Sequence, residues 1–413
     1  MLDICRSALS VATVCVLAVT ASHAADGAAG STLCTALARL QTEGAGGTVL
    51  TMFLPSYLSS IGGPPLPEAL QNTAFVYDNS LAAMAFLACG EIDRARSIGD
   101  ALIVAGGKDR FYMDGRLRNA YRAGPITENP ALPGWWDDRS KVWAEDEYQV
   151  STAAGNVAWA ALALLQLHEK TKEAKYLEAA ERLAIWLDQL RGDDLSPGVV
   201  GGYYGFEPKA VRIAWKSTEH NIDTLAVARW LSMISENPRW EGLAESTLQF
   251  VTSMRDDKSG FLIGTDLTGN AVHSTDLWLD VQVWPFLVVP KSRRPAKWAD
   301  TIGLMDAKLA VPGGYDFNGD RDGLWIEGTA QAALLFQQEG EPKRASELIA
   351  SILENVDPQS GLLYATSGPP LSTGLTVGAM GQGGAFMYQH WPHLGATAWA
   401  VMAAMDFNPF RPN

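Results

Sequence analysis

The feature that most constrains the fold is a repeated pairing of two kinds of helical segment. The first segment of a pair is apolar or small almost throughout, as in AWAALALLQL and GTAQAALLF. The second is amphipathic and charged, as in EAKYLEAAERLAIWLDQL. A helix that is apolar on all sides must be buried, whereas a helix with a polar stripe faces water along that stripe. The pattern therefore predicts buried inner helices, each followed in the chain by a helix that covers it.

Five such pairs follow one another, and helices near the two ends of the chain can form a sixth. The pairs are Asn79–Cys89 with Ile92–Val104, Thr152–Lys170 with Lys172–Leu190, Asn221–Ser235 with Trp240–Met254, Leu277–Val288 with Ala296–Leu309, Trp325–Gln338 with Pro342–Leu353, and Thr32–Thr42 with Gly395–Met405. Pro285 should kink or end the fourth inner helix. Six hairpins predict an all-α fold, an (α/α)6 barrel. A two-domain bundle is the alternative, but no linker rich in Pro, Ser or charge divides residues 25–413.

The first 24 residues are typical of a secretory signal peptide. Arg6 precedes an apolar run from Ala8 to Thr20, and Ser22-His23-Ala24 fits a cleavage site. We therefore expect a periplasmic or secreted protein with no membrane span after cleavage. Cys34 and Cys89 remain in the mature chain, and an oxidising compartment favours a disulfide between them over two buried thiols.

The composition limits the partners. The net charge of −14 argues against nucleic acid as a partner, because a strongly anionic protein is repelled by the phosphate backbone. The sequence contains no nucleotide-binding glycine fingerprint and no metal-binding histidine spacing, so we expect no cofactor and no metal. It does not specify an oligomeric state.

Polar and aromatic residues gather where the inner helices begin. In a ring of hairpins all inner helices point the same way, so their first residues share one mouth of the barrel. Each acid there is, taken singly, more often a helix cap than a catalyst. The joint pattern exceeds capping, because acids recur beside Trp, Tyr and His. The residues expected at the mouth are Tyr77, Asp78, Tyr148, Trp215, Glu219, His220, Asn221, Asp223, Asp276, Asp280, Trp325, Glu327, His390 and Trp391.

Carboxylates and aromatic rings at a cleft suit carbohydrate chemistry. Aromatic faces stack on the apolar faces of sugar rings. Glycosidic hydrolysis needs one protonated carboxyl as acid and one carboxylate as base or nucleophile. The sequence therefore predicts a carbohydrate substrate.

Four blocks carry a family resemblance. The strings YDNSLAAMAFLACGEIDRA, KSTEHNID, LWIEGTAQAALLF and GATAWAVMAAMDFNPF resemble the six-hairpin glycosidase-like superfamily, from about Thr73 to Phe410. The resemblance implies an (α/α)6 barrel with a sugar-binding funnel at one end. It does not specify a substrate, because members act on many glycans and some are epimerases or lyases.

The residues themselves suggest the roles. We expect Glu219 to be the general acid, with Glu327 as the rival, and Asp276 to be the base, with Asp78 close behind. Asp223 lies one helical turn beyond Glu219, so it either raises the pKa of Glu219 or binds a sugar hydroxyl. The remaining mouth residues are expected to bind substrate: Tyr77, Tyr148, Trp215, His220, Asn221, Asp280, Trp325, His390 and Trp391. Acids on separate helices leave room for a water molecule, which favours inversion.

Two rival functions remain. A lyase or epimerase on the same barrel would use Tyr148, His220, Tyr388 or His390 to move a carbon-bound proton. A non-catalytic glycan-binding protein would need the aromatic residues but no pair of acids. The segment DFNGDRDGLWIE partly matches a calcium loop, but its sixth position is Arg321 where the turn needs glycine, so we expect a solvated acidic turn.

Overall fold

The structure is a computed structural model that describes residues 26–47, 50–61, 63–192, 196–272, 277–376 and 384–412. The expected signal peptide and its cleavage site lie outside these ranges. Within them, no helix is both long and apolar enough to cross a membrane.

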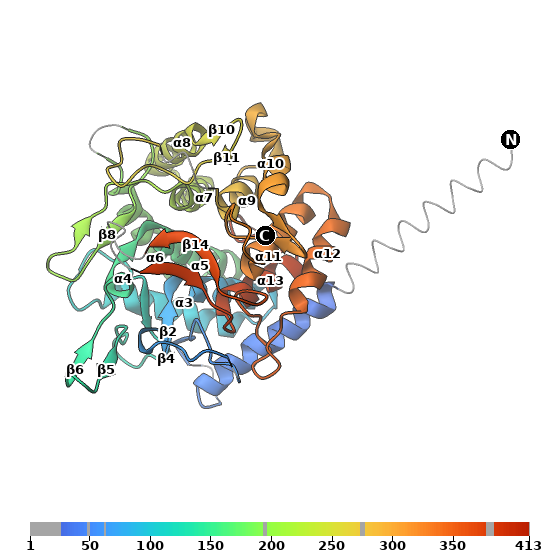
Figure 1. Ribbon diagram of the computed structural model, residues 1–413. Helices are drawn as coiled ribbons and strands as arrows, with labels where there is room; N and C mark the ends of the chain where they lie inside the picture. Colours follow the sequence, from blue (N-terminus) through green and yellow to red (C-terminus); the bar gives the residue numbers. More distant parts are fainter. Residues whose placement is uncertain are drawn as a thin grey trace, which may run out of the picture.

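Six buried helices form a closed inner ring (Figure 1). They are α2 (Val76–Ala88), α5 (Ala154–Thr171), α7 (Thr218–Ile234), α9 (Leu279–Val288), α11 (Ile326–Glu339) and α13 (Leu394–Ala404). Each packs against the next in chain order, and α13 packs against α2. This arrangement confirms the expected (α/α)6 barrel.

The covering helices follow their inner partners. They are α3 (Ile92–Gly107), α6 (Ala174–Asp188), α8 (Pro238–Ser253), α10 (Thr301–Leu309), α12 (Pro342–Leu353) and the helix of residues 26–44. That last helix completes the sixth hairpin across the termini, because Gly30 packs against Ala404 and Met405 at the end of α13. The structure also joins Cys34 of this helix to Cys89 in a disulfide, the pairing favoured from the sequence.

The fourth hairpin differs from the sequence prediction. The single helix expected over Ala296–Leu309 is divided into a 3₁₀ turn, Ala296–Trp298, and α10. The turn follows Pro295, and 3₁₀ segments rarely continue beyond three or four residues. Pro285 lies inside α9, which ends three residues later at Val288, so the proline is accommodated in the last turn.

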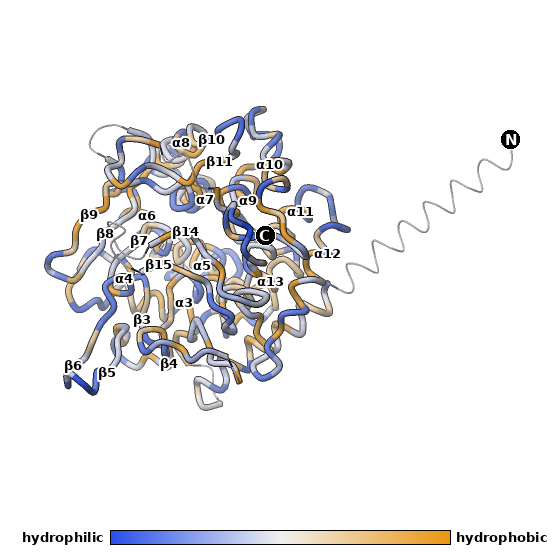
Figure 2. The backbone as a smooth tube through the Cα atoms, in the orientation of Figure 1, coloured by the Kyte–Doolittle hydropathy of each residue, from blue (hydrophilic) through white to orange (hydrophobic). Residues whose placement is uncertain are grey.

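Short antiparallel ribbons connect the helices. They are β1 (Met52–Phe53) with β4 (Gly124–Pro125), β2 (Thr73–Phe75) with β3 (Ala120–Arg122), β5 (Trp135–Asp137) with β6 (Val142–Ala144), β7 (Thr152–Ala153) with β8 (Gly202–Tyr204) and β9 (Val211–Arg212), β10 (Arg255–Asp256) with β11 (Gly260–Phe261), β12 (Ala310–Val311) with β13 (Gly314–Tyr315), and β14 (Leu371–Thr376) with β15 (Ala385–Tyr388). The remaining short helices are Glu68–Leu70, α4 (Glu147–Val150) and Lys291–Arg293. The β14–β15 ribbon crosses in front of the ring in Figure 1. The β5–β6 ribbon projects from the body, and its tip is hydrophilic (Figure 2).

One polar position recurs in five of the six inner helices and anchors the loop that precedes each hairpin. The fourth residue of the helix uses its side chain to hydrogen-bond the backbone of that loop. Such bonds satisfy loop peptide groups that would otherwise be buried without partners. The residues are Asn79, Asn221, Gln282, Thr329 and Thr397.

The axis of the ring is filled by aromatic side chains. Trp159, Trp284 and Trp399 come from three inner helices, and Phe410 enters from the C-terminal segment. Their ring centroids lie 4.9 to 6.3 Å apart. These side chains therefore close the barrel along its axis.

Candidate functional site

The first two turns of the inner helices bring five carboxyl groups together at the mouth of the ring. Asp78 comes from α2, Glu219 and Asp223 from α7, Asp280 from α9 and Glu327 from α11. These five residues, with His393 before α13, are called the acidic pit below. The sequence premise that acids far apart in the chain become neighbours at one end of the barrel holds for these residues.

Glu327 is fixed on one side of the pit by donors from two helices. The hydroxyl of Tyr77 donates to Glu327 Oε1 at 2.5 Å, and the indole N–H of Trp399 donates to the same hydroxyl at 2.9 Å. Gln331, one turn further along α11, donates to Glu327 Oε1 at 3.4 Å. Tyr77, which the sequence predicts to bind substrate, therefore hydrogen-bonds Glu327 in the structure.

His393 lies between Asp78 and Glu327. Its Nε2 is 3.4 Å from Asp78 Oδ1, and its Nδ1 is 3.6 Å from Glu327 Oε2. The neighbouring Gly395 makes this approach possible. A β-carbon on Gly395 would stand 2.7 Å from Asp78 Oδ1 and 3.1 Å from Glu327 Oε2, so a side chain there would displace the carboxyls.

The other side of the pit is built from α7 and α9. Asp223 is fully buried, and neither of its carboxylate oxygens has a hydrogen-bond partner among the residues that the structure describes. The indole of Trp159 lies near Asp223 and favours the ionised form of its carboxyl. The two groups do not meet the geometry of a hydrogen bond. Gly155 of α5 leaves space here, because a β-carbon would come within 3.3 Å of Asp223 Oδ2 and 2.5 Å of the His220 ring.

Burial raises the pKa of four of these carboxyls, and repulsion between neighbouring carboxyls adds to the effect at three of them. Burial raises the pKa of Glu219 well above its usual range, and Asp280 and Glu327 add to the effect. Burial, then Glu219 and Asp280, raise the pKa of Asp223 in the same way. Burial raises the pKa of Asp280 to about 7. Burial also raises the pKa of Glu327 to about 7; the neighbouring Asp78 and Asp280 add to this rise, whereas His393 opposes it. Several groups in the pit can therefore hold a proton near neutral pH.

The pKa values of the two imidazoles near the carboxyls are shifted in opposite directions. Burial lowers the pKa of His220 to about 4, so this ring is neutral. Burial also opposes protonation of His393, but Asp78 and then Glu327 overcome it and raise its pKa. Trp215 packs beside His220, with ring centroids 5.7 Å apart, so both residues lie at the edge of the pit.

Tyrosines from three loops surround the acids. Tyr57 stacks on His393 with centroids 4.5 Å apart, and Tyr388 of β15 lies 6.3 Å from the same ring. Tyr148 of α4 is partly exposed, and burial, Glu219 and Asp78 raise its pKa to about 12. These rings supply flat surfaces beside the carboxyls, as a sugar-binding site requires.

Four predicted site residues have other roles in the structure. The side-chain amide of Asn221 hydrogen-bonds the backbone of Val199 and Ser217, so it anchors the loop before α7. Trp325 is almost wholly buried behind Tyr388 and Phe317.

Trp391 and His390 make contacts with neighbouring loops. The Trp391 indole donates to Pro64 O at 2.9 Å, and its ring packs edge-on against Tyr57. His390 stacks on Tyr364 at 3.9 Å and its Nδ1 lies 2.6 Å from Thr366 O. Both residues support the loop before α13. Asp276, the expected base, lies outside the described residues.

The sequence reasoning missed Tyr57, Trp159 and the role of His393. One signal was present for His393: it immediately precedes the last inner helix, and its Nδ1 accepts from Ala396 N–H as a cap. Nothing in the sequence marked Tyr57, which comes from a loop, or Trp159, which resembles an ordinary core residue.

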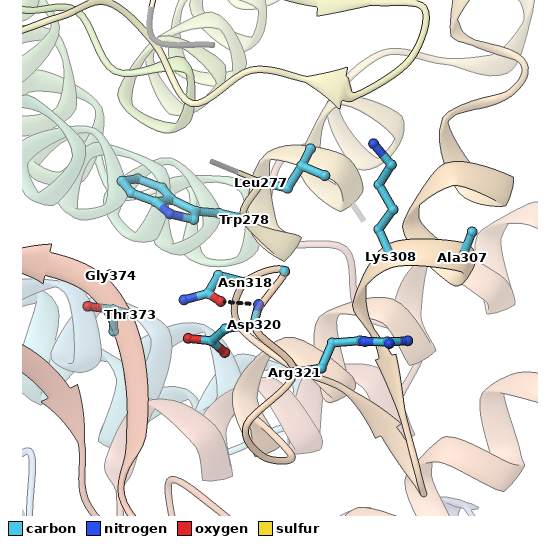
Figure 3. Close-up of a pocket in the computed structure, with 10 residues that line it drawn as sticks. Leu277, Trp278, Ala307, Lys308, Asn318, Asp320, Arg321, Thr373 and Gly374 are labelled. Atoms are coloured by element: carbon cyan, nitrogen blue, oxygen red, sulfur yellow. Dashed lines mark hydrogen bonds between the residues drawn. The ribbon is translucent and has the colours of Figure 1, made fainter. Parts of the chain in front are cut away.

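A second hollow of about 510 Å³ lies beside the start of α9 (Figure 3). Leu277 and Trp278 stand on one side, Asn318 and Asp320 in the middle, and Thr373 of β14 on the other. Trp278 comes two residues before Asp280, so this hollow adjoins the rim of the barrel.

One acid of the loop beside that hollow is buried, whereas the sequence predicts a solvated turn. Asp316, Asp320 and Asp322 bring carboxylate oxygens within 4.8 Å of one another, and Asp316 is fully buried, so this is not simply a solvated turn. Arg321 adopts a left-handed backbone conformation, with φ of 54°, at the sixth position of the loop, where a calcium-binding loop has glycine. A complete calcium loop also needs its twelfth residue, but Glu327 is held by Tyr77 and Gln331.

Comparisons with known proteins support the architecture. No family model matches the sequence, and no curated protein has a significantly similar sequence. Solved structures do match. A glycosidase variant in complex with glucose aligns over 94% of this chain and 98% of its own, with 13% identity and a TM-score of 0.61.

Two further matching structures are enzymes with different activities. A GH76 α-mannanase from Bacteroides thetaiotaomicron aligns over 92% of this chain and 96% of its own, with 12% identity and a TM-score of 0.58. Cellobiose 2-epimerase from Spirochaeta thermophila covers 86% and 89%, with 12% identity and a TM-score of 0.56. The chain thus has the six-hairpin (α/α)6 fold of these carbohydrate-active enzymes, which confirms the fold resemblance seen in the sequence.

Proposed function

We propose that the chain is a glycoside hydrolase that cleaves a poly- or oligosaccharide by paired-carboxyl catalysis. The observation that carries this proposal is the acidic pit itself, in which carboxyl groups from four inner helices meet beside Tyr57, Tyr148 and Tyr388. The fold shared with glycosidases and a mannanase supports it.

In this proposal Glu219 is the proton donor and Asp78 is the base. Glu219 is partly exposed, so a glycosidic oxygen can reach it, and its raised pKa keeps it protonated near neutral pH. A water oxygen bonds to the anomeric carbon while the bond from that carbon to the leaving oxygen breaks. Asp78 takes the proton from the water, and Glu219 gives its own proton to the leaving oxygen. Glu327 remains the rival donor, although it is almost wholly buried.

We also propose an inverting outcome and export from the cytoplasm. Glu219 and Asp78 belong to different helices, which favours a water molecule between them and hence inversion. The leader-like first 24 residues and the Cys34–Cys89 disulfide support a periplasmic or extracellular location.

A sugar epimerase is the second candidate. The presence of two imidazoles, His220 and His393, in the pit favours it, because a carbon-bound proton needs a base of this kind. The structural likeness to cellobiose 2-epimerase is compatible with this alternative.

The test is a screen of neutral plant and bacterial polysaccharides, including α-mannan and starch, for new reducing ends. Glu219→Gln should abolish turnover while substrate binding and the melting temperature stay close to those of the wild type. Glu245→Gln, an exposed glutamate on α8, is the matched control and should keep full activity. Proton NMR of the first product reports the anomer.

The outcomes separate the candidate functions. Hydrolysis that survives Glu219→Gln would refute the assigned donor. An epimer formed from cellobiose without new reducing ends would favour the second candidate. Binding without any turnover would indicate a non-catalytic glycan-binding protein.

A further inference from the structure

Two tryptophans form an exposed pair on the β5–β6 ribbon, which projects from the barrel (Figure 1). Trp136 lies directly opposite Trp143, and directly opposed residues of an antiparallel pair point to the same face of the ribbon. Trp136 is 52% exposed and Trp143 is 48% exposed. Tryptophan is highly buried on average, so two half-exposed indoles on one face are a feature that core packing does not explain.

Both indoles are held by neighbouring groups. A β-carbon on Gly134 would collide with Trp143 Nε1, so this indole lies directly on the glycine. The guanidinium of Arg122 lies 5.3 Å from the Trp143 ring centroid and also donates to Gly134 O. The Trp136 indole is oriented by its Nε1, which donates to Asp138 Oδ1 at 3.2 Å. Such preorganisation lowers the entropic cost of binding a ligand on the two rings.

The tip of the ribbon carries no net charge. Its two acids, Asp137 and Asp138, are balanced by Arg139 and Lys141, and Lys141 Nζ lies 3.2 Å from Asp138 Oδ1. A neutral tip does not attract an anionic membrane or nucleic acid, and the net charge of −14 on the whole chain repels both. The polar groups of the tip instead suit the hydroxyls of a neutral sugar, which donate and accept hydrogen bonds.

The ribbon is continuous with the rim of the acidic pit. Tyr148 borders the pit, where burial and then Glu219 raise its pKa. It follows Trp143 by five residues, so their Cα atoms lie at most about 18 Å apart. On the other side, Arg122 belongs to β3, which pairs with β2, and β2 leads directly into α2 with Asp78. A glycan chain on the ribbon can therefore extend toward the pit.

We propose that Trp136 and Trp143 form a platform on which one stretch of a neutral polysaccharide stacks while another stretch occupies the acidic pit. The inference rests on the proposed hydrolase function and assigns its substrate to polymers. The apolar faces of sugar rings pack on indoles. A second contact on the same glycan chain also raises the local concentration of substrate at the pit.

The area of the platform argues against a protein as its occupant. A stable protein interface buries about 800 Å² on each partner. Two half-exposed indoles offer only about 200 Å². That area is enough for a few sugar rings but is far below what a second copy of this chain would need.

Affinity electrophoresis in gels that contain α-mannan, starch or xylan tests the platform. Glu219→Gln serves as the parent, so that the gel polysaccharide is not consumed. At least one of these glycans should retard the parent, and Trp136→Ala with Trp143→Ala should weaken the apparent affinity roughly tenfold. Met233→Ala is the matched control, because Met233 is 63% exposed at the far end of α7, and it should migrate like the parent.

Steady-state kinetics on the active protein give a second readout. A trisaccharide fills the pit without reaching the ribbon, whereas a polymer occupies both. The ratio of kcat/KM on the polymer to kcat/KM on the trisaccharide should therefore fall roughly tenfold in the double tryptophan variant. An equal loss on both substrates would overturn the inference, because it would indicate general damage to the fold.

Trp136→Thr keeps the test available if the double variant does not fold. Threonine favours a strand, and this change leaves Trp143 on Gly134. Its apparent affinity should fall in the same direction. Unchanged retardation, or no retardation of the parent by any of the three glycans, would overturn the platform.

Two further outcomes separate this inference from its alternatives. A dimer in sedimentation that the tryptophan substitutions convert to a monomer would assign the face to a second copy and overturn the platform. Retardation that depends on the two tryptophans, in a protein that hydrolyses no glycan, would refute the proposed hydrolase but support the platform.

Discussion

Replacing Glu327 by glutamine should stabilise the protein at alkaline pH. Burial raises the pKa of Glu327 from 4.5 to about 7, so the folded state prefers the protonated carboxyl. A carboxyl whose folded-state pKa lies above its unfolded value contributes stability that is present below pH 4.5 and is lost as the pH rises through 7. The step from 4.5 to about 7 corresponds to a loss of roughly 3 kcal/mol.

Glutamine imitates the protonated form and does not titrate. Its carbonyl can still accept from Tyr77 and Gln331, and its amide nitrogen takes the position of Glu327 Oε2, which lies 3.6 Å from His393 Nδ1. We therefore expect Glu327→Gln to match the wild type near pH 4.5 and to exceed it by up to roughly 3 kcal/mol at pH 8.

The assay is urea unfolding, followed by circular dichroism at several pH values from 4.5 to 8. Glu347→Gln, on the solvent side of α12, is the control and should run parallel to the wild type. A difference in unfolding free energy between Glu327→Gln and the wild type that does not change with pH would refute the argument that burial keeps Glu327 protonated.

Three other changes test the framework of the site. Gly395→Ala should reduce kcat/KM at least tenfold while the fold persists, because its β-carbon would stand 2.7 Å from Asp78 Oδ1; unchanged steady-state kinetics would contradict the tight packing of the pit. Asn221→Ala should cost roughly 1–3 kcal/mol in urea unfolding, because it leaves buried peptide groups of the preceding loop without partners. Cys34→Ser with Cys89→Ser should lower stability by roughly 2–5 kcal/mol but keep activity at 25 °C, and equal melting temperatures with and without reductant would argue against the bridge.

The ring of inner helices can be predicted from the sequence alone. Helices that are apolar on every face, such as α5 and α13, must be buried, and their alternation with amphipathic helices leaves few architectures besides paired layers. The same reasoning placed Asp78, Glu219 and Glu327 at one mouth, because residues at the starts of parallel helices share one end of the ring.

Only the tertiary structure separated the site from its framework. Glu219 and Asn221 are two residues apart at the start of α7, yet one faces the pit and the other ties down a loop. Sequence spacing gives the direction of a side chain around its own helix, but it does not give the neighbouring segment that the side chain contacts. The contact between His393 and Asp78 likewise exists because α13 closes the ring against α2, a contact that joins positions 315 residues apart and that no local pattern can encode.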